Sequence, residues 1–147
     1  MHKEFVRPGQ TVNGKFYCEV LRRLRGNVRH KRHEMWKNGD WLVHHDDAPA
    51  HTSLVVTEFL TKNNMTTVPH PAYSPDLAPC DLYVFPKMKL LLKGRHFLSI
   101  EEIQAESQQV LNTLKPADFN VCFQKWQNCW DRCIQAQDDY FEGDSGN

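Results

Sequence analysis

Apolar residues in the first half of the chain follow two different spacings. From Asn13 they recur every four positions, at 16, 20, 24 and 28, which is typical of one face of a helix. The runs Trp-Leu-Val at 41–43 and Met-Thr-Thr-Val at 65–68 are short and bounded by turn-forming residues. We therefore predict two short strands, with a helix between them that is capped at position 52 or 53 and ends near 62. Glu-Phe-Val at 4–6 is predicted to be the end of a further strand.

The second half of the chain is predicted to be helical after an irregular, proline-containing loop over 73–81. We expect one helix over about 81–92 with a break near Pro86, one from a capping box at 99–102 to about 114, and one over about 116–136. Strands that alternate with helices indicate an α/β fold. Two or three strands make a thin sheet for about five helices, so either the fold is mostly helical or strands are missing on the N-terminal side.

Length and composition narrow the class of protein. A chain of 147 residues with 40% hydrophobic residues is long enough for one domain, which we place at 1–137, followed by an acidic flexible tail over 138–147. No apolar stretch approaches the ~20 residues of a membrane span, so no membrane partner is expected. Five cysteines without C-x-x-C pairs argue for reduced thiols in an intracellular protein, against a disulfide framework or a zinc ribbon.

The formal net charge is zero, but the charge is divided unevenly along the chain. Residues 1–95 hold 15 Lys and Arg against 9 Asp and Glu, whereas residues 96–147 hold 3 against 9. The first part, with a net charge of +6, is suited to face a polyanion. A solvated helix surface explains the same excess of basic residues, and on charge alone we favour that reading.

The densest group of polar side chains is His-His-Asp-Asp-Ala-Pro-Ala-His at 44–51, directly after the predicted strand at 41–43. Carboxylates at the carboxyl end of a buried strand are common ligand groups in α/β folds. Mg²⁺ sites use one or two carboxylates, so Asp46 needs a partner. Asp76 and Asp81 are candidates, with 29 and 34 residues between each and Asp46. The spacing alone does not choose between them, and turn or capping roles explain either one.

A zinc site built from histidines is a weaker alternative. His44 and His45 are adjacent, so in a strand their side chains point to opposite faces. Only His45 and His51 then remain usable together, and no H-E-x-x-H motif accompanies them. Hydrogen-bonded structural histidines explain the pattern better than zinc ligands do.

Four longer stretches carry a resemblance. HHDDAPAHTS and VPHPAYSPDLAPCDLYVFPKMK are similar to the mariner-family DNA transposases, as are RPGQTVNGKFYCEVLRRL and FPKMKLLLKGRHF. The chain also resembles the transposase part of a fusion between a SET histone methyltransferase and a mariner element. The resemblance implies an RNase H-like catalytic domain with three metal-binding aspartates and Mg²⁺ or Mn²⁺ as cofactor. It further implies metal-dependent phosphodiester hydrolysis and strand transfer, in which two cations ~4 Å apart act on the attacking and leaving oxygens.

Carried onto this chain, the family's HDNAPAH and YSPDLAPxD motifs make Asp46 and Asp81 the second and third metal-binding, catalytic aspartates. The family's first aspartate, in a T-G-D-E motif, has no counterpart in these 147 residues, and the helix-turn-helix region is also absent. Asp47 stands where the family usually has asparagine. We therefore expect an N-terminally truncated RNase H-like domain that is inactive in isolation, because a full metal site needs all three carboxylates.

The resemblance implies DNA as the partner, a homodimer and a nuclear location. The candidate nucleic-acid-binding residues are Arg22, Arg23, Arg25, Arg29, Lys31, Arg32, Lys87, Lys89, Lys93 and Arg95. The candidate assembly loop comprises Tyr73, Ser74, Pro75, Asp76, Leu77, Ala78 and Pro79. Two alternatives remain at this point: a nucleic-acid-binding or dimerisation module without chemistry, and a transposase-derived segment of a SET-domain fusion protein.

Overall fold

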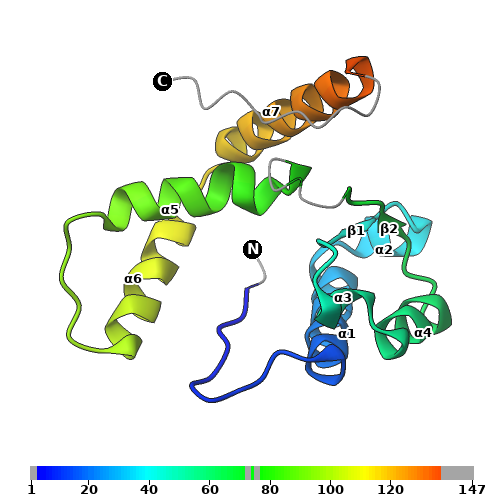
Figure 1. Ribbon diagram of the computed structural model, residues 1–147, viewed down its shortest axis with the longest axis horizontal. Coiled ribbons are helices and arrows are strands. Elements are labelled where there is room, and N and C mark those ends of the chain that lie inside the picture. Colours follow the sequence, from blue (N-terminus) through cyan, green and yellow to red (C-terminus); the bar gives the residue numbers. More distant parts are fainter. Residues whose placement is uncertain (1–2, 72–73, 75–76, 137–147) are drawn as a thin grey trace. The chain divides into compact units, whose positions relative to one another are not determined.

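The computed structural model describes residues 3–71, 74 and 77–136, and the chain divides into two compact units. The first unit is Met1–Ala72 and the second is Tyr73–Asn147. Figure 1 labels their helices and strands. The predicted acidic tail at 138–147 lies outside the described residues. No described helix is both long and apolar enough to span a membrane.

The first unit is a small parallel sheet with helices packed around it. In chain order its elements are α1 (Gly14–Lys31), α2 (His33–Asn38), β1 (Val43–His44), α3 (Pro49–Thr52), α4 (Leu54–Lys62) and β2 (Thr67–Val68). The long helix α1 begins where the sequence predicts, because the Asn13 side chain accepts a hydrogen bond from the backbone N–H of Phe16 at 2.9 Å. The short helix α2 was not predicted; it ends at Gly39, whose φ of 71° is a left-handed C-cap.

The two predicted strands form, and both are shorter than expected. Strands β1 and β2 pair in parallel, with Val43 opposite Thr67 and His44 opposite Val68. The predicted strand at 4–6 is wrong: residues 3–13 are irregular, and a turn there is closed by the Gln10 N–H bond to Arg7 O at 3.0 Å. A strand needs a neighbour to satisfy its backbone groups, and in the described part of the chain none pairs with this segment.

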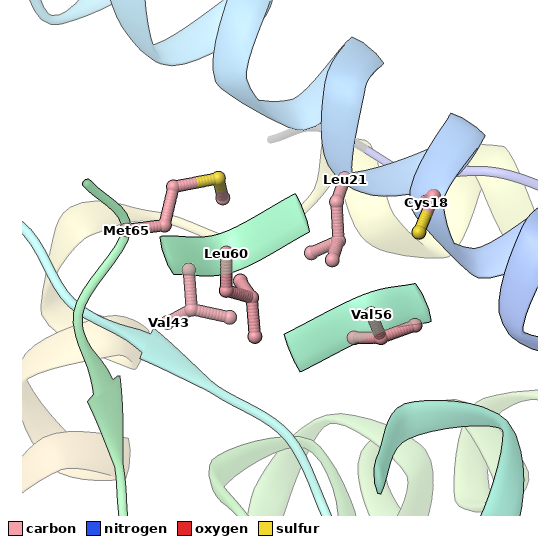
Figure 2. Close-up of a cluster of buried hydrophobic side chains, with 6 residues drawn as sticks. All are labelled: Cys18, Leu21, Val43, Val56, Leu60 and Met65. Atoms are coloured by element: carbon pink, nitrogen blue, oxygen red, sulfur yellow. The ribbon is translucent and has the colours of Figure 1, made fainter. Parts of the chain in front are cut away.

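One cluster of buried side chains holds the first unit together (Figure 2). Helix α1 contributes Cys18 and Leu21, α4 contributes Val56 and Leu60, and Val43 of β1 lies beside Leu60. Leu21 is 1% exposed and Val56 is 0% exposed, so they are at the centre of the cluster. The predicted stripe at 16, 20, 24 and 28 lies beside this inward face: of its four positions only Leu24 packs against the cluster, and none is fully buried.

Helices α1 and α4 come so close at one end that only glycine fits there. A Cβ on Gly14 would overlap Ser53 Oγ and lie 2.8 Å from Val55 Cγ1. Gly26, in the interior of the same helix, has no atom within 4 Å of its Cβ position.

These two glycines give a matched pair of substitutions. We expect Gly14→Ala to lower the free energy of unfolding by about 1–3 kcal/mol, because it overpacks the contact with α4. We expect Gly26→Ala to raise it by roughly 0.5–1 kcal/mol through helix propensity. Urea unfolding followed by circular dichroism measures both, and equal effects for the two variants would contradict the close approach at Gly14.

The second unit is helical, as predicted. Its elements are η2 (Cys80–Val84), a single turn of π-helix, followed by α5 (Phe85–Leu92), α6 (Ile100–Asn112) and α7 (Pro116–Gln135). The break expected near Pro86 is the change from π- to α-helix: Phe85 N–H bonds to Cys80 O, and Pro86 has no N–H with which to continue the ladder. Half of the predicted capping box of α6 forms: Ser99 Oγ accepts from Glu102 N at 3.1 Å, but the Glu102 carboxylate accepts from Leu98 N at 2.7 Å and not from Ser99 N.

Helix α7 covers the segment that leads into η2. Trp126 Nε1 donates to Leu77 O at 2.6 Å, and Cys122 Sγ lies 3.5 Å from Pro79 O. Leu77 is 2% exposed and Cys122 is 3% exposed, whereas Phe123 on the same helix is 55% exposed. The apolar stripe of α7 is therefore only partly a core face.

Candidate metal centre

Asp46 follows strand β1 by two residues, at the carboxyl end of the strand, as the sequence predicts. Its Oδ1 accepts two hydrogen bonds, from Ala48 N at 3.1 Å and from His51 Nδ1 at 2.5 Å. An ionised carboxylate only accepts hydrogen bonds, so the proton in the second contact is on His51 Nδ1. Pro49 begins helix α3, and this turn of helix brings His51 back towards Asp46.

Aromatic rings fix His51 in turn. The rings of Tyr17 and His51 have centroids 4.0 Å apart, and the ring of His45 lies parallel to that of His51 at 5.4 Å. The hydroxyl oxygen of Tyr17 lies 3.0 Å from His45 Nδ1. The side chain of His51 is 21% exposed and that of Asp46 is 52% exposed. A half-exposed carboxylate is thus supported by a largely enclosed ring.

The electrostatics of this cluster favour an ionised Asp46 together with a neutral Tyr17 and a neutral His45. Partial burial disfavours the charge, but the bonds from Ala48 N–H and His51 outweigh it, so the pKa of Asp46 is lowered. Burial, helped by the Asp46 charge, raises the pKa of Tyr17 to about 12. Burial and then His51 lower the pKa of His45.

The neighbouring histidines point in opposite directions, which confirms the prediction from strand geometry. His44 Nε2 lies 3.0 Å from Nδ1 of His70, which follows β2, whereas His45 contacts Tyr17 of α1. Among the residues that the structure describes, no three His, Cys, Asp or Glu side chains gather in a metal-binding arrangement. The histidines make ring and hydrogen-bond contacts with one another and with Tyr17.

Asp81 lies in the second unit, in the first turn of η2, and is exposed. Asp76 lies outside the described residues. A nearby network fixes the helix that carries Asp81: Asp118 of α7 accepts from Tyr83 Oη at 3.0 Å, from Lys87 Nζ and from Lys115 N. Asp118 thus ties the start of α7 to both η2 and α5.

This network makes the second unit sensitive to acid. The bond from Lys87, then that from Lys115 N–H, then that from Tyr83, lower the pKa of Asp118 to about 2. A carboxyl group whose pKa is lower in the folded state stabilises the fold above its unfolded pKa, near 4, and that contribution disappears as the pH falls to about 2. We expect Asp118→Asn to flatten the pH dependence of amide exchange in α7 over this range, while Asp131→Asn, exposed on the same helix, leaves it unchanged.

Many of the predicted nucleic-acid-binding residues already have partners within the chain. Arg23 makes two bonds to the Glu4 carboxylate, at 2.8 and 2.6 Å, and Arg25 lies over the Trp36 ring at 4.7 Å. Ion pairs also join Arg22 to Glu19, Lys87 to Asp118, and Arg95 to Glu106. The other predicted residues are exposed, with no ion pair among the described residues: Arg29, Lys31, Arg32, Lys89 and Lys93.

The candidate assembly loop is described only in part. Tyr73, Pro75 and Asp76 lie outside the described residues. Leu77 is buried against α7 within its own unit, and Ala78 and Pro79 are half-buried. From the sequence, His51 is expected only as a possible zinc ligand, and Tyr17 has no expected role in the site. The spacing in HHDDAPAH, with a helix-starting proline between Asp46 and His51, was the available signal for their contact.

The residues at the end of β1 suit a hard divalent cation to a limited degree. Both hydrogen bonds to Asp46 found in the described residues are accepted by Oδ1. The pKa of Asp46 is lowered and its side chain is 52% exposed, so it offers an ionised oxygen donor, the type that Mg²⁺ and Mn²⁺ prefer. One carboxylate is too few for tight binding, so further ligands are required.

Comparison with known proteins identifies relatives along nearly the whole chain. The mariner Mos1 transposase of Drosophila mauritiana is 30% identical over 143 residues, which is 97% of this chain and 41% of that protein. The histone-lysine N-methyltransferase SETMAR of Homo sapiens is 21% identical over 142 residues, 97% of this chain and 21% of that protein. The chain thus spans less than half the length of either relative. No protein-family model matches it.

Solved structures of Mos1 transposase also match this chain. The crystal structure of the Mos1 catalytic domain matches with a TM-score of 0.83 at 31% identity, over 95% of this chain and 69% of that domain. A pre-cleavage Mos1 transpososome matches with a TM-score of 0.86 at 31% identity, over 95% of this chain and 41% of the transposase chain. Other matching Mos1 structures were solved with Mn or Mg, or with a left transposon end. The predicted RNase H-like α/β fold is confirmed, and the chain belongs to the mariner transposase family.

Proposed function

We propose that this chain is the part of a cut-and-paste DNA transposase catalytic domain that supplies two of its metal-binding carboxylates, Asp46 and Asp81. The main observation in support is the ionised, half-exposed Asp46 at the end of β1, whose Oδ1 is held by hydrogen bonds from Ala48 and His51. The likeness to Mos1 catalytic-domain structures solved with Mn and with Mg supports a divalent metal. The family motif that ends at Asp81 supports the second ligand.

The bound cations would activate the attacking oxygen and stabilise the leaving oxygen of a phosphodiester. The residues of this chain would bind the cations and hold the metal-binding side chains in position. Asp46 and Asp81 offer oxygen ligands, and the network around Asp118 holds the helices that follow Asp81. The resemblance implies three aspartates, and these 147 residues contain counterparts of two. We therefore expect the purified chain alone to give no detectable metal-dependent cleavage of DNA carrying mariner ends.

Metal competition tests the proposal directly. Electron paramagnetic resonance of free Mn²⁺ should show that the purified chain binds Mn²⁺ and that Mg²⁺ displaces it, since both cations prefer the same oxygen ligands. Ca²⁺, which is larger, should compete less well. A chain that binds no Mn²⁺, or whose bound Mn²⁺ is not displaced by Mg²⁺, would contradict a transposase-type metal site.

A second candidate function is DNA binding without chemistry. It is favoured by three exposed basic residues, Arg29, Lys31 and Arg32, at the end of α1. Matching Mos1 structures include complexes with a transposon end and a strand transfer complex, which supports DNA as the partner in either case. The resemblance to the mariner family also leads us to propose a nuclear location and homodimer assembly for either function. Origin as a transposase-derived segment of a SET-domain fusion is a separate alternative.

The salt dependence of DNA binding distinguishes basic residues that contact DNA phosphates from those that already form an ion pair within the chain. We expect the triple variant Arg29→Ala, Lys31→Ala, Arg32→Ala to weaken DNA binding and to reduce the slope of log K against log salt by about 0.9 for each lost phosphate contact. Arg23→Ala should leave the slope unchanged, because Glu4 already holds that guanidinium. Fluorescence anisotropy with a labelled duplex measures both slopes. Equal slopes in the two variants would place the DNA contacts elsewhere.

A further inference from the structure

We propose that His51 is a positioning residue: its Nδ1–H locks the Asp46 carboxylate in one rotamer, so that Oδ2 is presented to the metal before the metal binds. This inference rests on the proposed function of Asp46 as a metal ligand. It assigns His51 a role through Asp46 and not through contact with metal or DNA.

The geometry carries the argument. Asp46 is 52% exposed, and a surface aspartate without anchors exchanges among rotamers. Here Oδ1 accepts from Ala48 N at 3.1 Å and from His51 Nδ1 at 2.5 Å, so two donors from different directions hold the same oxygen. The position of Oδ2 is then fixed by the planarity of the carboxylate.

The ring of His51 is itself held in place. Tyr17 lies against it with ring centroids 4.0 Å apart, and the parallel ring of His45 lies 5.4 Å away. A donor on a mobile side chain would fix nothing, whereas a ring held by α1 and by the residue after β1 transmits the rigidity of the first unit to Asp46. Partners of this kind, which orient a ligating carboxylate, are typically worth 10–100-fold in metal affinity.

Packing alone is the competing explanation, and two substitutions separate it from positioning. His51→Phe keeps an aromatic ring beside Tyr17 and His45 but removes the donor. His51→Asn removes the ring but places an amide N–H close to where Nδ1–H was. Positioning predicts that His51→Phe weakens Mn²⁺ binding by about 10–100-fold while His51→Asn stays within about threefold of the wild type. Packing alone predicts the reverse order.

Two measurements without metal keep the test independent of the proposed function. In the unmutated chain, long-range ¹H–¹⁵N spectra should show the proton of His51 on Nδ1, and three-bond couplings of Asp46 should fit a single χ1 rotamer. His51→Phe should average those couplings, and His51→Asn should not. A proton found on Nε2 alone, or couplings unchanged in His51→Phe, would overturn the inference. Absence of Mn²⁺ binding by the wild type would contradict the metal-ligand role of Asp46 and leave the rotamer result to decide the role of His51.

Discussion

Replacing Leu21 with alanine is expected to lower the free energy of unfolding of the first unit by about 3–4 kcal/mol, close to a complete loss of a marginal fold. Leu21 is 1% exposed and lies among Cys18, Val43, Val56 and Leu60, so its removal leaves a cavity that α1 and α4 both line. Such a small sheet cannot compensate, because β1 and β2 contain only two residues each.

Leu54→Ala is the matched control. Leu54 is 74% exposed at the start of α4, and alanine is the better helix former, so we expect a change within about 0.5 kcal/mol. Urea titration read by the amide signals of residues 14–71 measures both variants. A small effect of Leu21→Ala would mean that the cluster in Figure 2 does not hold the unit together.

Replacing Asp46 with asparagine is expected to weaken Mn²⁺ binding by at least about 100-fold, more than the 10–100-fold typical of an outer partner. The substitution keeps the size of the side chain and removes the charge that a hard cation requires. It also leaves an oxygen that still accepts from Ala48 N, so the fold around β1 should survive.

Asp47→Asn controls for general charge. Asp47, like Asp46, is exposed. We expect Asp47→Asn to change Mn²⁺ affinity by less than about tenfold, since an exposed carboxylate that is not a ligand acts on the cation only through water of high dielectric constant. Calorimetric titration measures both affinities. A similar loss of Mn²⁺ affinity in both variants would mean that the acidic turn attracts the cation only through its overall charge, and that Asp46 is not a ligand.

Local signals explain which parts of the fold were predicted. Asn13, Ser99 and Pro116 each mark a helix start that the structure confirms, because capping depends on residues only a few positions apart. Helix α2 was missed because it is only six residues long, too short for a repeated apolar spacing to mark it. The strand predicted at 4–6 failed because a strand depends on a distant partner.

Part of the candidate site could also be predicted from the sequence, and part could not. The position of Asp46 after a strand follows from sequence, whereas its contact with His51 depends on how α3 turns back. The ion pair between Arg23 and Glu4 spans 19 positions, and no local pattern announces it. From the sequence, the basic residues of α1 are therefore expected to be equally available for DNA. In the structure some of them already have partners within the chain and others do not.

A Mn²⁺ titration of the ¹⁵N-labelled chain, followed by NMR, decides whether Asp46 and Asp81 are metal ligands. Paramagnetic broadening is predicted to centre on residues around both Asp46 and Asp81, and to be lost at both positions in Asp81→Asn as well as in Asp46→Asn. Broadening around only one of them, or evenly along the chain, would contradict the claim that these two aspartates are ligands of a transposase-type metal site.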